Sequence, residues 1–445
     1  MSPMKEVTLL MTQGQINRYH VIRKSLEGTM TIAEAAAAIG LSERQVKRLR
    51  NGVKEEGAAF LIHKSKNKPS KRATPEKTKD RIIELYRSEM YTGANFVHFT
   101  ELLAENEKIN HSYKTVHDIL NAAGIESPKK RRRFRPHRSR KRKEQEGLLI
   151  QMDASPYEWF GGRVKYSLHG SIDDATGKIT GAYMTKNECL HGYLEVMRHT
   201  VERFGVPVGA YVDMHVIFRS QKASSLTIED QLAGKTVNDT QFGRAMKELG
   251  INLIYARSPQ AKGRIERLWE TLQSRLVIEF RIRNIETVHE ANAFLIEYIP
   301  KFNEQFAVIP EQLEQAYSIL SPNIDLDLIL CIKESRIADN GGVFSFNGKL
   351  FKIVDYDEKG KSKISVIASA TRGLLVNHKD KVYDVLPFIR PKKVDKATRN
   401  ERWKVASTEG HCWKSGNRYI PLYSSELSDP VIYEMLNDIF LSKYA

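Results

Sequence analysis

Hydrophobic and polar residues alternate along the chain in two ways, with helical spacing near the amino terminus and with strand spacing further on. In residues 29–52, apolar side chains recur every three or four positions, at Ile32, Ala35, Ala36 and Ile39. A Gly-Leu-Ser turn then separates them from a second stretch with the same spacing. Two short helices joined by a tight turn are typical of a helix-turn-helix motif.

Both of these helices begin with a capping signal. Thr31 precedes Glu34 by three positions, and Ser42 precedes Gln45 by three, which is the spacing of a capping box. The second helix carries side chains of the types that reach bases and phosphates in a major groove, namely Arg44, Gln45, Lys47 and Arg48. We therefore expect a helix-turn-helix DNA-binding domain in residues 1–62, with a purely structural helical hairpin as the alternative.

A second set of helices is predicted in residues 75–127, after a polar segment rich in Lys, Ser and Pro. Its last helix has a cap at Ser112 and a terminating glycine at Gly124. Because its architecture repeats that of residues 1–62, we interpret it as a second helical DNA-binding domain. Two such modules in tandem could cover a long DNA site.

A strongly basic linker, residues 128–146, follows. It contains eleven Lys or Arg residues between Lys129 and Lys143, with no acidic residue in that stretch. Such a block displaces counterions from phosphates, so it is interpreted as a nucleic-acid-binding segment. Its most concentrated cations are the candidate DNA contacts Lys130, Arg131, Arg132 and Arg133. A solvated tether is the alternative.

The overall composition narrows the class of protein. The chain has 445 residues, a length that predicts several domains. Its formal charge of +16 predicts a polyanionic partner. The cysteines Cys189, Cys331 and Cys412 are far apart, so disulfides and structural zinc are not expected. No long apolar run suggests a membrane span. We expect a cytoplasmic protein that makes no membrane contact.

From about residue 147 the pattern changes to strands that alternate with helices. Strands are predicted at 148–155, 164–174, 178–185, 208–214 and 251–257, and helices at 191–205, 240–250 and 261–283. This order predicts an α/β domain with a mixed sheet in residues 147–310. Short strands in residues 337–390 predict a small β-barrel, and residues 391–445 form a basic carboxy-terminal tail.

Three acidic residues occupy informative positions in the α/β domain. Asp153 and Asp213 lie at the ends of predicted strands, where open sheets bind ligands, and Glu266 lies one turn into the last helix. Oxygen donors without histidine or cysteine suit Mg²⁺ or Mn²⁺ better than zinc. Taken singly, each residue could also be a turn residue or half of a surface ion pair. His215 could contact phosphate or simply fill a packing role.

Four segments around these acids resemble one family. The segments are QMDASPYEWF, SIDDATGKITGAY, YVDMHVIFRS and the stretch from TQFGRAMKELG to SPQAKGRIERLW. They are similar to the DDE transposases of bacterial insertion sequences, in particular the ISNCY group, within the retroviral-integrase superfamily. Glu270 does not occupy the motif position. The spacing from Asp213 to Glu266 exceeds the family's usual one, and residues 220–240 account for the surplus as a surface loop or as a further DNA or partner contact.

The resemblance implies an RNase H-like catalytic domain in which Asp153, Asp213 and Glu266 bind two Mg²⁺ ions, with Mn²⁺ as a possible substitute. It implies that Lys262 and Arg267 contact DNA beside this triad. The implied activity is hydrolytic cleavage at the element's terminal repeats and joining of 3′-hydroxyl ends to target DNA. A homodimer or larger multimer would act on double-stranded DNA in the nucleoid. A catalytically inactive, transposase-derived repressor is the alternative.

Overall fold

The computed structural model describes residues 10–63, 73–129, 140–219, 239–256, 262–390 and 430–440. The chain divides into two compact units, Met1–Arg81 and Ile82–Ala445, and the division falls within helix α4 (Glu76–Arg87). The predicted DNA contacts Lys130 to Arg133 and most of the 220–240 segment lie outside the described residues. No helix within the described ranges is both long and apolar enough to cross a bilayer.

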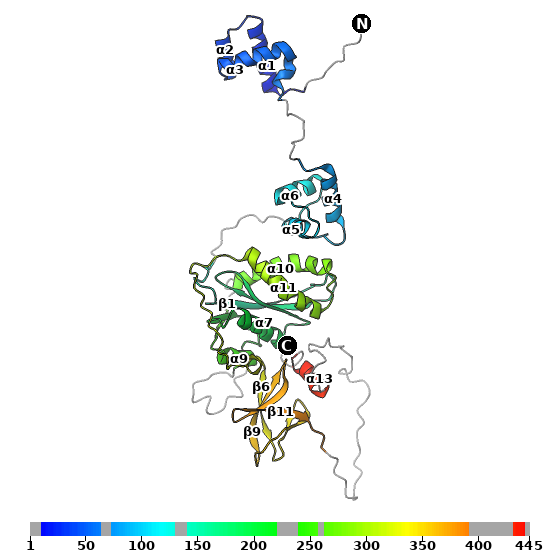
Figure 1. The fold of residues 1–445 in the computed structure, drawn as a ribbon, viewed down its shortest axis with the longest axis vertical. Coiled ribbons are helices and arrows are strands. Elements are labelled where there is room, and N and C mark those ends of the chain that lie inside the picture. The colour runs from blue at the N-terminus through cyan, green and yellow to red at the C-terminus, as the bar shows by residue number, and fades with distance from the viewer. Residues whose placement is uncertain are drawn as a thin grey trace. The chain divides into compact units, whose positions relative to one another are not determined.

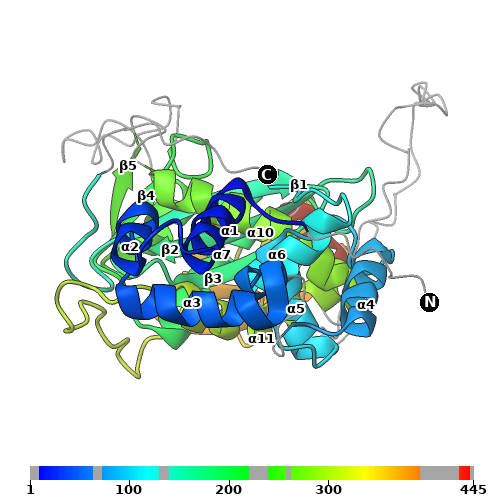
Figure 2. The ribbon, with the colours of Figure 1, turned by 90° about the horizontal axis from the view of Figure 1, so that it is seen from above.

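The first unit is a cluster of short helices. Its elements are α1 (Gln13–Leu26), α2 (Ile32–Ile39), α3 (Glu43–Glu56) and the short 3₁₀ helix η1 (Gly57–Leu61). The three α-helices pack on one another (Figures 1 and 2) around a small core that includes Ile22, Ala35 and Val46. The helix-turn-helix pattern predicted for residues 29–52 is confirmed by α2 and α3.

Both predicted capping boxes are present. The Thr31 hydroxyl accepts from the backbone nitrogen of Glu34, and the Glu34 carboxylate accepts in return from the backbone nitrogen of Thr31. Ser42 and Gln45 make the same reciprocal pair. Gly40 ends α2 with a φ of 64°, a left-handed conformation that glycine adopts without strain. Local sequence therefore sets the start of both helices.

The second unit begins with a helical group. Helices α5 (Phe96–Asn106) and α6 (Tyr113–Ala122) pack with α4 around an aromatic core that contains Phe96 and Phe99. Ser112 caps α6 as predicted. The same core includes Ile278, which belongs to a later helix, α10 (Gly263–Ile282). The helical group is thus packed against the α/β domain.

A five-stranded sheet forms the centre of the α/β domain. Its strands are β1 (Ile150–Tyr157), β2 (Tyr166–Asp173), β3 (Ile179–Thr185), β4 (Gly209–Val212) and β5 (Asn252–Tyr255). Their order is β3-β2-β1-β4-β5, antiparallel from β3 to β1 and parallel from β1 to β5, which confirms the predicted mixed sheet. Helices α10 and α11 (Val288–Phe306) cover one face, and α7 (Leu190–Arg203) covers the other (Figure 1). Helix α9 (Gln241–Glu248) precedes β5.

Helix α11 also protects the outer edge of the sheet. The side-chain amide of Asn303 both donates to and accepts from the backbone of Ile179 in β3. Asn292 makes the same two bonds with Met184, at the other end of β3. These amides satisfy backbone groups that an edge strand would otherwise expose.

The predicted barrel is a six-stranded sheet of order β6-β9-β10-β11-β8-β7. Its strands are β6 (Ile332–Ala338), β7 (Val343–Phe346), β8 (Lys349–Ile353), β9 (Ser362–Ser369), β10 (Gly373–His378) and β11 (Lys381–Pro387), and the short helix α12 (Leu326–Ile329) precedes them. The end strands β6 and β7 contact each other, so the sheet is nearly closed. One hydrophobic core runs from the central sheet into this barrel.

The carboxy-terminal tail contains an element that the sequence analysis missed. Helix α13 (Pro430–Asp438) packs on β10 and buries Met435 and Leu436 in the core that the barrel and the central sheet share. Residues 391–429 lie outside the described part of the chain. The tail is therefore more than a basic extension, since its last described segment completes a core.

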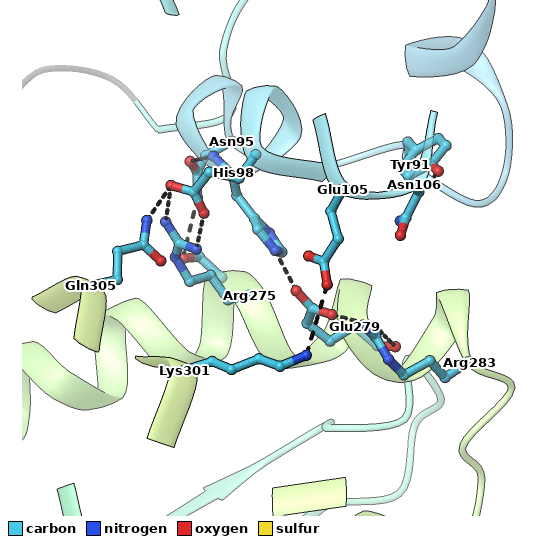
Figure 3. Close-up of polar contacts among 12 residues, drawn as sticks. Tyr91, Asn95, His98, Glu105, Asn106, Arg275, Glu279, Arg283, Lys301 and Gln305 are labelled. Carbon is cyan, nitrogen blue, oxygen red and sulfur yellow. Dashed lines mark hydrogen bonds and ion pairs between the residues drawn. The ribbon is translucent and has the colours of Figure 1, made fainter. Parts of the chain in front are cut away.

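Helix α5 is attached to α10 by buried charges (Figure 3). The His98 Nε2 nitrogen donates to the Glu279 carboxylate at 2.8 Å, and both side chains are almost fully buried. Arg283 also pairs with Glu279, and Arg275 makes a two-pronged contact with Glu101 of α5 at 2.6 and 3.0 Å. Burial alone would raise the pKa of Glu279, but the bonds from His98 and Arg283 lower it below its ordinary value of 4.5.

This interface makes stability depend on pH. A carboxylate whose pKa is depressed by folding stabilises the protein above about pH 4.5, and the stabilisation is lost as the pH falls through the lower folded-state value. We expect Glu279→Gln to destabilise the second unit by about 2 kcal/mol at pH 7. Thermal unfolding should show this difference shrinking as the pH is lowered below 4.5. Glu297→Gln, at an exposed position of α11, is the matched control and should change little. An undiminished difference at low pH would contradict the assignment.

Candidate active site

Alternate residues of β1 present a polar row to helix α10. The Gln151 side-chain oxygen accepts from the backbone nitrogen of Ile265 at 3.3 Å, and the Ser155 hydroxyl accepts from Gln273 at 3.0 Å. Asp153 lies between them. Because side chains of a strand alternate between faces, positions 151, 153 and 155 all point to the same side. Strand β1 and successive turns of α10 are therefore held in register by polar contacts.

The Asp153 carboxylate is held by two donors from α10 and its start. The Lys262 ammonium lies 2.7 Å from Asp153 Oδ1, and the Trp269 indole nitrogen donates to Asp153 Oδ2 at 3.1 Å. The same ammonium lies 4.0 Å from Asp213 Oδ2. The side chain of Lys262 is only 8% exposed, against 24% for Asp153 and 41% for Asp213. One buried cation thus joins two neighbouring strands. Asp213 directly follows β4 as predicted, but Asp153 lies in the middle of β1 and not at its end, because β1 continues to Tyr157 in its pairing with β2.

A glycine makes the Trp269 contact possible. Gly170 of β2 lies directly opposite Asp153 in the antiparallel register. A Cβ atom at Gly170 would lie 2.7 Å from Cη2 of the Trp269 ring, closer than real side chains approach. The missing side chain therefore leaves room for the indole that orients Asp153.

The residues around Asp213 form a tight turn after β4. Asp213 Oδ1 accepts from the backbone nitrogen of His215 at 2.9 Å. The His215 ring in turn accepts from the backbone nitrogen of Ile217 at 3.5 Å, a local structural role. Beneath this turn, burial raises the pKa of Tyr193 well above its ordinary value of 10.0, and the charges of Glu188, Asp153 and Asp213 raise it further. Tyr193 therefore stays neutral and donates to Glu188 at 2.7 Å.

The other two residues predicted for this site lie on α10. Glu266 is in the first turn, four residues after Lys262, and both Glu266 and Arg267 are exposed. Within the described ranges, no three carboxylate, imidazole or thiol groups lie close enough to hold one metal ion. Asp153 and Asp213 thus meet at a common cation, whereas Glu266 does not join them. Its role as a third ligand stays a prediction.

The aspartate pair is chemically suited to a divalent cation. Its donors are carboxylate oxygens, the ligands that Mg²⁺ and Mn²⁺ prefer. Both carboxylates already face a single positive charge, the ammonium of Lys262. Asp153 and Asp213 therefore suit a metal ion for two reasons: they offer carboxylate oxygens, and both already face one cation. Lys262 is paired inside the site, so a DNA contact by it stays a prediction.

The candidate DNA contacts of α3 differ in whether their side chains already make a hydrogen bond within the helix cap. Arg44, Lys47 and Arg48 are exposed. Gln45 is exposed too, but its amide oxygen accepts from the backbone nitrogen of Ser42 at 3.2 Å. A two-bond contact with adenine uses both the oxygen and the nitrogen of the amide. Gln45 would therefore have to give up its cap to make that contact.

Several residues of this site were not found from the sequence. Trp269, Gly170, Gln151 and Ser155 all position Asp153 or the helix beside it. A signal for two of them was present, because Gln151, Asp153 and Ser155 alternate within an otherwise apolar strand. No local pattern marks the fit between Gly170 and Trp269, since these residues come together only in the folded sheet.

Comparisons with known proteins identify relatives of this chain. A winged helix-turn-helix family model matches residues 18–79. The transposase for insertion sequence IS1202 of Streptococcus pneumoniae is 33% identical over 90% of this chain and 93% of its own length. A putative transposase, y4bF, of Sinorhizobium fredii is 35% identical over 76% of this chain and 72% of its own length.

A solved structure is also similar, more distantly. The intasome of simian T-cell lymphotropic virus, in complex with the PP2A regulatory subunit B56 gamma, is 14% identical, covering 69% of this chain and 96% of that chain with a TM-score of 0.29. A likeness of this size supports no conclusion about either fold or function. The two bacterial relatives, in contrast, are similar over most of their length, and on that ground the chain belongs to the family of insertion-sequence transposases.

Proposed function

We propose that this protein binds the ends of its mobile element, cleaves DNA there by metal-assisted hydrolysis, and joins the 3′-hydroxyl ends to target DNA. The observation that carries the proposal is the pair Asp153, within β1, and Asp213, directly after the neighbouring strand β4, which share the buried Lys262 ammonium. The membership of the chain in a transposase family gives this carboxylate pair a substrate class.

The proposed catalytic domain is RNase H-like, with Asp153, Asp213 and Glu266 as the residues that hold divalent metal. Bound there, two Mg²⁺ ions would activate the attacking oxygen and stabilise the leaving one during in-line displacement at phosphorus. The protein's own part is to position these carboxylates. Trp269 and Gly170 fix Asp153, while Gln151 and Ser155 hold the helix that carries Glu266.

The cations of the site have a second proposed task. The Lys262 ammonium lies within 4.0 Å of both aspartates, so it is placed to neutralise a phosphate bound beside them. Arg267 is exposed on the same helix and could bind a neighbouring phosphate. Such charge-assisted contacts would hold DNA while the carboxylates act on one ester bond.

The first unit is the proposed reader of the element's ends. Arg44, Lys47 and Arg48 project from α3, the second helix of the helix-turn-helix, and can contact bases and phosphates. Joining two ends of one element requires both to be held together. We therefore propose that a homodimer or larger multimer forms on the DNA.

The proposal is tested with labelled DNA that carries the element's ends, incubated with the full-length protein and Mg²⁺. Nicking and joining are expected, and both should stop when a chelator removes the metal. Binding of those ends by the wild type without nicking would refute the proposal and support an inactive repressor instead.

Asp153→Asn should lower nicking by at least about a thousandfold, because it removes a charge that metal binding needs. Affinity for the element's ends, measured by gel shift, should stay within about twofold, since α3 is untouched. The control Glu158→Gln neutralises an exposed carboxylate of the same domain and should leave nicking unchanged. Equal nicking by Asp153→Asn and wild type would exclude Asp153 as a ligand.

Trp269→Phe should keep the packing of the helix but remove the hydrogen bond to Asp153. We expect nicking to fall about tenfold, the effect of one lost bond to a charged group. Trp159→Phe is the matched control: it removes an indole donor from the same core, but that donor bonds the backbone oxygen of Ser155. If both variants nick equally, the Trp269 bond has no part in orienting Asp153.

Arg48→Ala and Gln45→Ala should affect the first unit differently. Arg48→Ala should weaken binding to the element's ends, because an exposed cation that can bind DNA is lost. The affinity should also fall less steeply with increasing salt concentration. Gln45→Ala should mainly lower the unfolding temperature, since it removes the partner of Ser42. Arg18→Ala, exposed on α1, serves as the control for charge. Equal salt slopes for Arg48→Ala and wild type would argue against this DNA contact.

A further inference from the structure

A further buried carboxylate, Asp174, lies in the turn between β2 and β3. The side chain of Asp174 is fully buried, and its carboxylate accepts hydrogen bonds from four groups. Arg140, Arg264 (3.0 Å) and Gln151 (2.7 Å) donate to Oδ1, and the backbone nitrogen of Lys143 donates to Oδ2 at 2.9 Å. A buried carboxylate is costly unless it is paired, and here two guanidinium groups pair with it.

Two of the four donors belong to the end of the basic linker. Arg140 and the backbone of Lys143 bind Asp174 itself, and Arg142 donates to the backbone oxygen of Ala175 at 3.1 Å. Lys141, between them, points the other way: its side chain is 74% exposed and pairs with Glu311. Residues 140–143 are therefore fixed on the β2–β3 turn through Arg140, Arg142 and the backbone of Lys143, and only part of their charge faces solvent.

The other two donors belong to the elements that carry the proposed catalytic carboxylates. Gln151 lies two residues before Asp153 on β1, and its side chain also binds the backbone nitrogen of Ile265. Arg264 lies two residues before Glu266 on α10, and it additionally donates to the backbone oxygen of Arg140 at 3.1 Å. One carboxylate thus connects the linker, β1 and the first turn of α10.

We infer that Asp174 is a positioning residue that holds the end of the basic linker at a fixed place beside the first turn of α10. DNA bound by the linker then enters the site in a set register, so that one particular phosphate meets the carboxylates. A passive tether would allow the DNA to slide. The inference rests on the proposed function. Its specific consequence is the choice of the phosphodiester bond that is cut, and not only the rate of cutting.

The comparison of Arg140→Ala with Lys141→Ala tests the anchor in the full-length protein. Both variants remove one linker cation, but only Arg140 contacts Asp174. Without DNA, hydrogen exchange of the amides of residues 141–146 should become about tenfold faster in Arg140→Ala and in Asp174→Asn, because a charge-assisted bond is lost. Lys141→Ala should exchange like wild type. Equal exchange in Arg140→Ala and Lys141→Ala would overturn the anchor.

The register is tested by sequencing the cut ends of the DNA substrate. Wild type and Lys141→Ala should cut at one position, whereas Arg140→Ala and Asp174→Asn should spread their cuts over neighbouring phosphates. Arg140→Ala keeps the test decisive if Asp174→Asn fails to fold, since Arg140 is partly exposed. A single unchanged position in all four proteins would overturn this inference alone. No cutting by the wild type would overturn the proposed function together with it.

Discussion

The contact between the polar row of β1 and helix α10 is the constraint on which the rest of the site depends. Asp153 receives both of its α10-side donors across this contact, and Gln151 and Ser155 hold the helix on either side of it. Polar bonds have defined directions, whereas an apolar contact would let the helix slide by a fraction of a turn. The polar contacts therefore fix the position of the helix along the strand.

The cations of α10 and of the residue that precedes it are mostly engaged within the protein. Lys262 binds Asp153, Arg264 binds Asp174, and Arg275 binds Glu101. Desolvation lowers the pKa of Arg264, and its neighbour Asp174 opposes this shift. A helix that is rich in Lys and Arg is easily interpreted as a DNA-binding surface. Here much of that charge instead pairs with carboxylates of the protein itself, so the number of cations in the sequence overstates what α10 offers to DNA.

Elements set by local residues were predictable, and contacts between distant residues were not. The capping boxes at Thr31 and Ser42, the strands of the mixed sheet and the barrel followed from spacing and turn residues. Helix α13 was missed because its apolar face has meaning only against the barrel. The fit of Trp269 over Gly170 joins residues 99 positions apart, which no local pattern can encode. The role of Glu266 as a third metal ligand remains a prediction, since within the described residues it does not join the aspartates.

The paired amides of Asn292 and Asn303 along β3 have a consequence for assembly. Each closes a backbone position at which a strand from another molecule could add to the sheet. A neighbouring copy that approached this edge would first have to detach α11, which also packs in the core beneath. A second copy would therefore meet this side of the protein through side-chain surfaces. The β3 edge of the central sheet is thus closed to strand addition for as long as α11 stays in place.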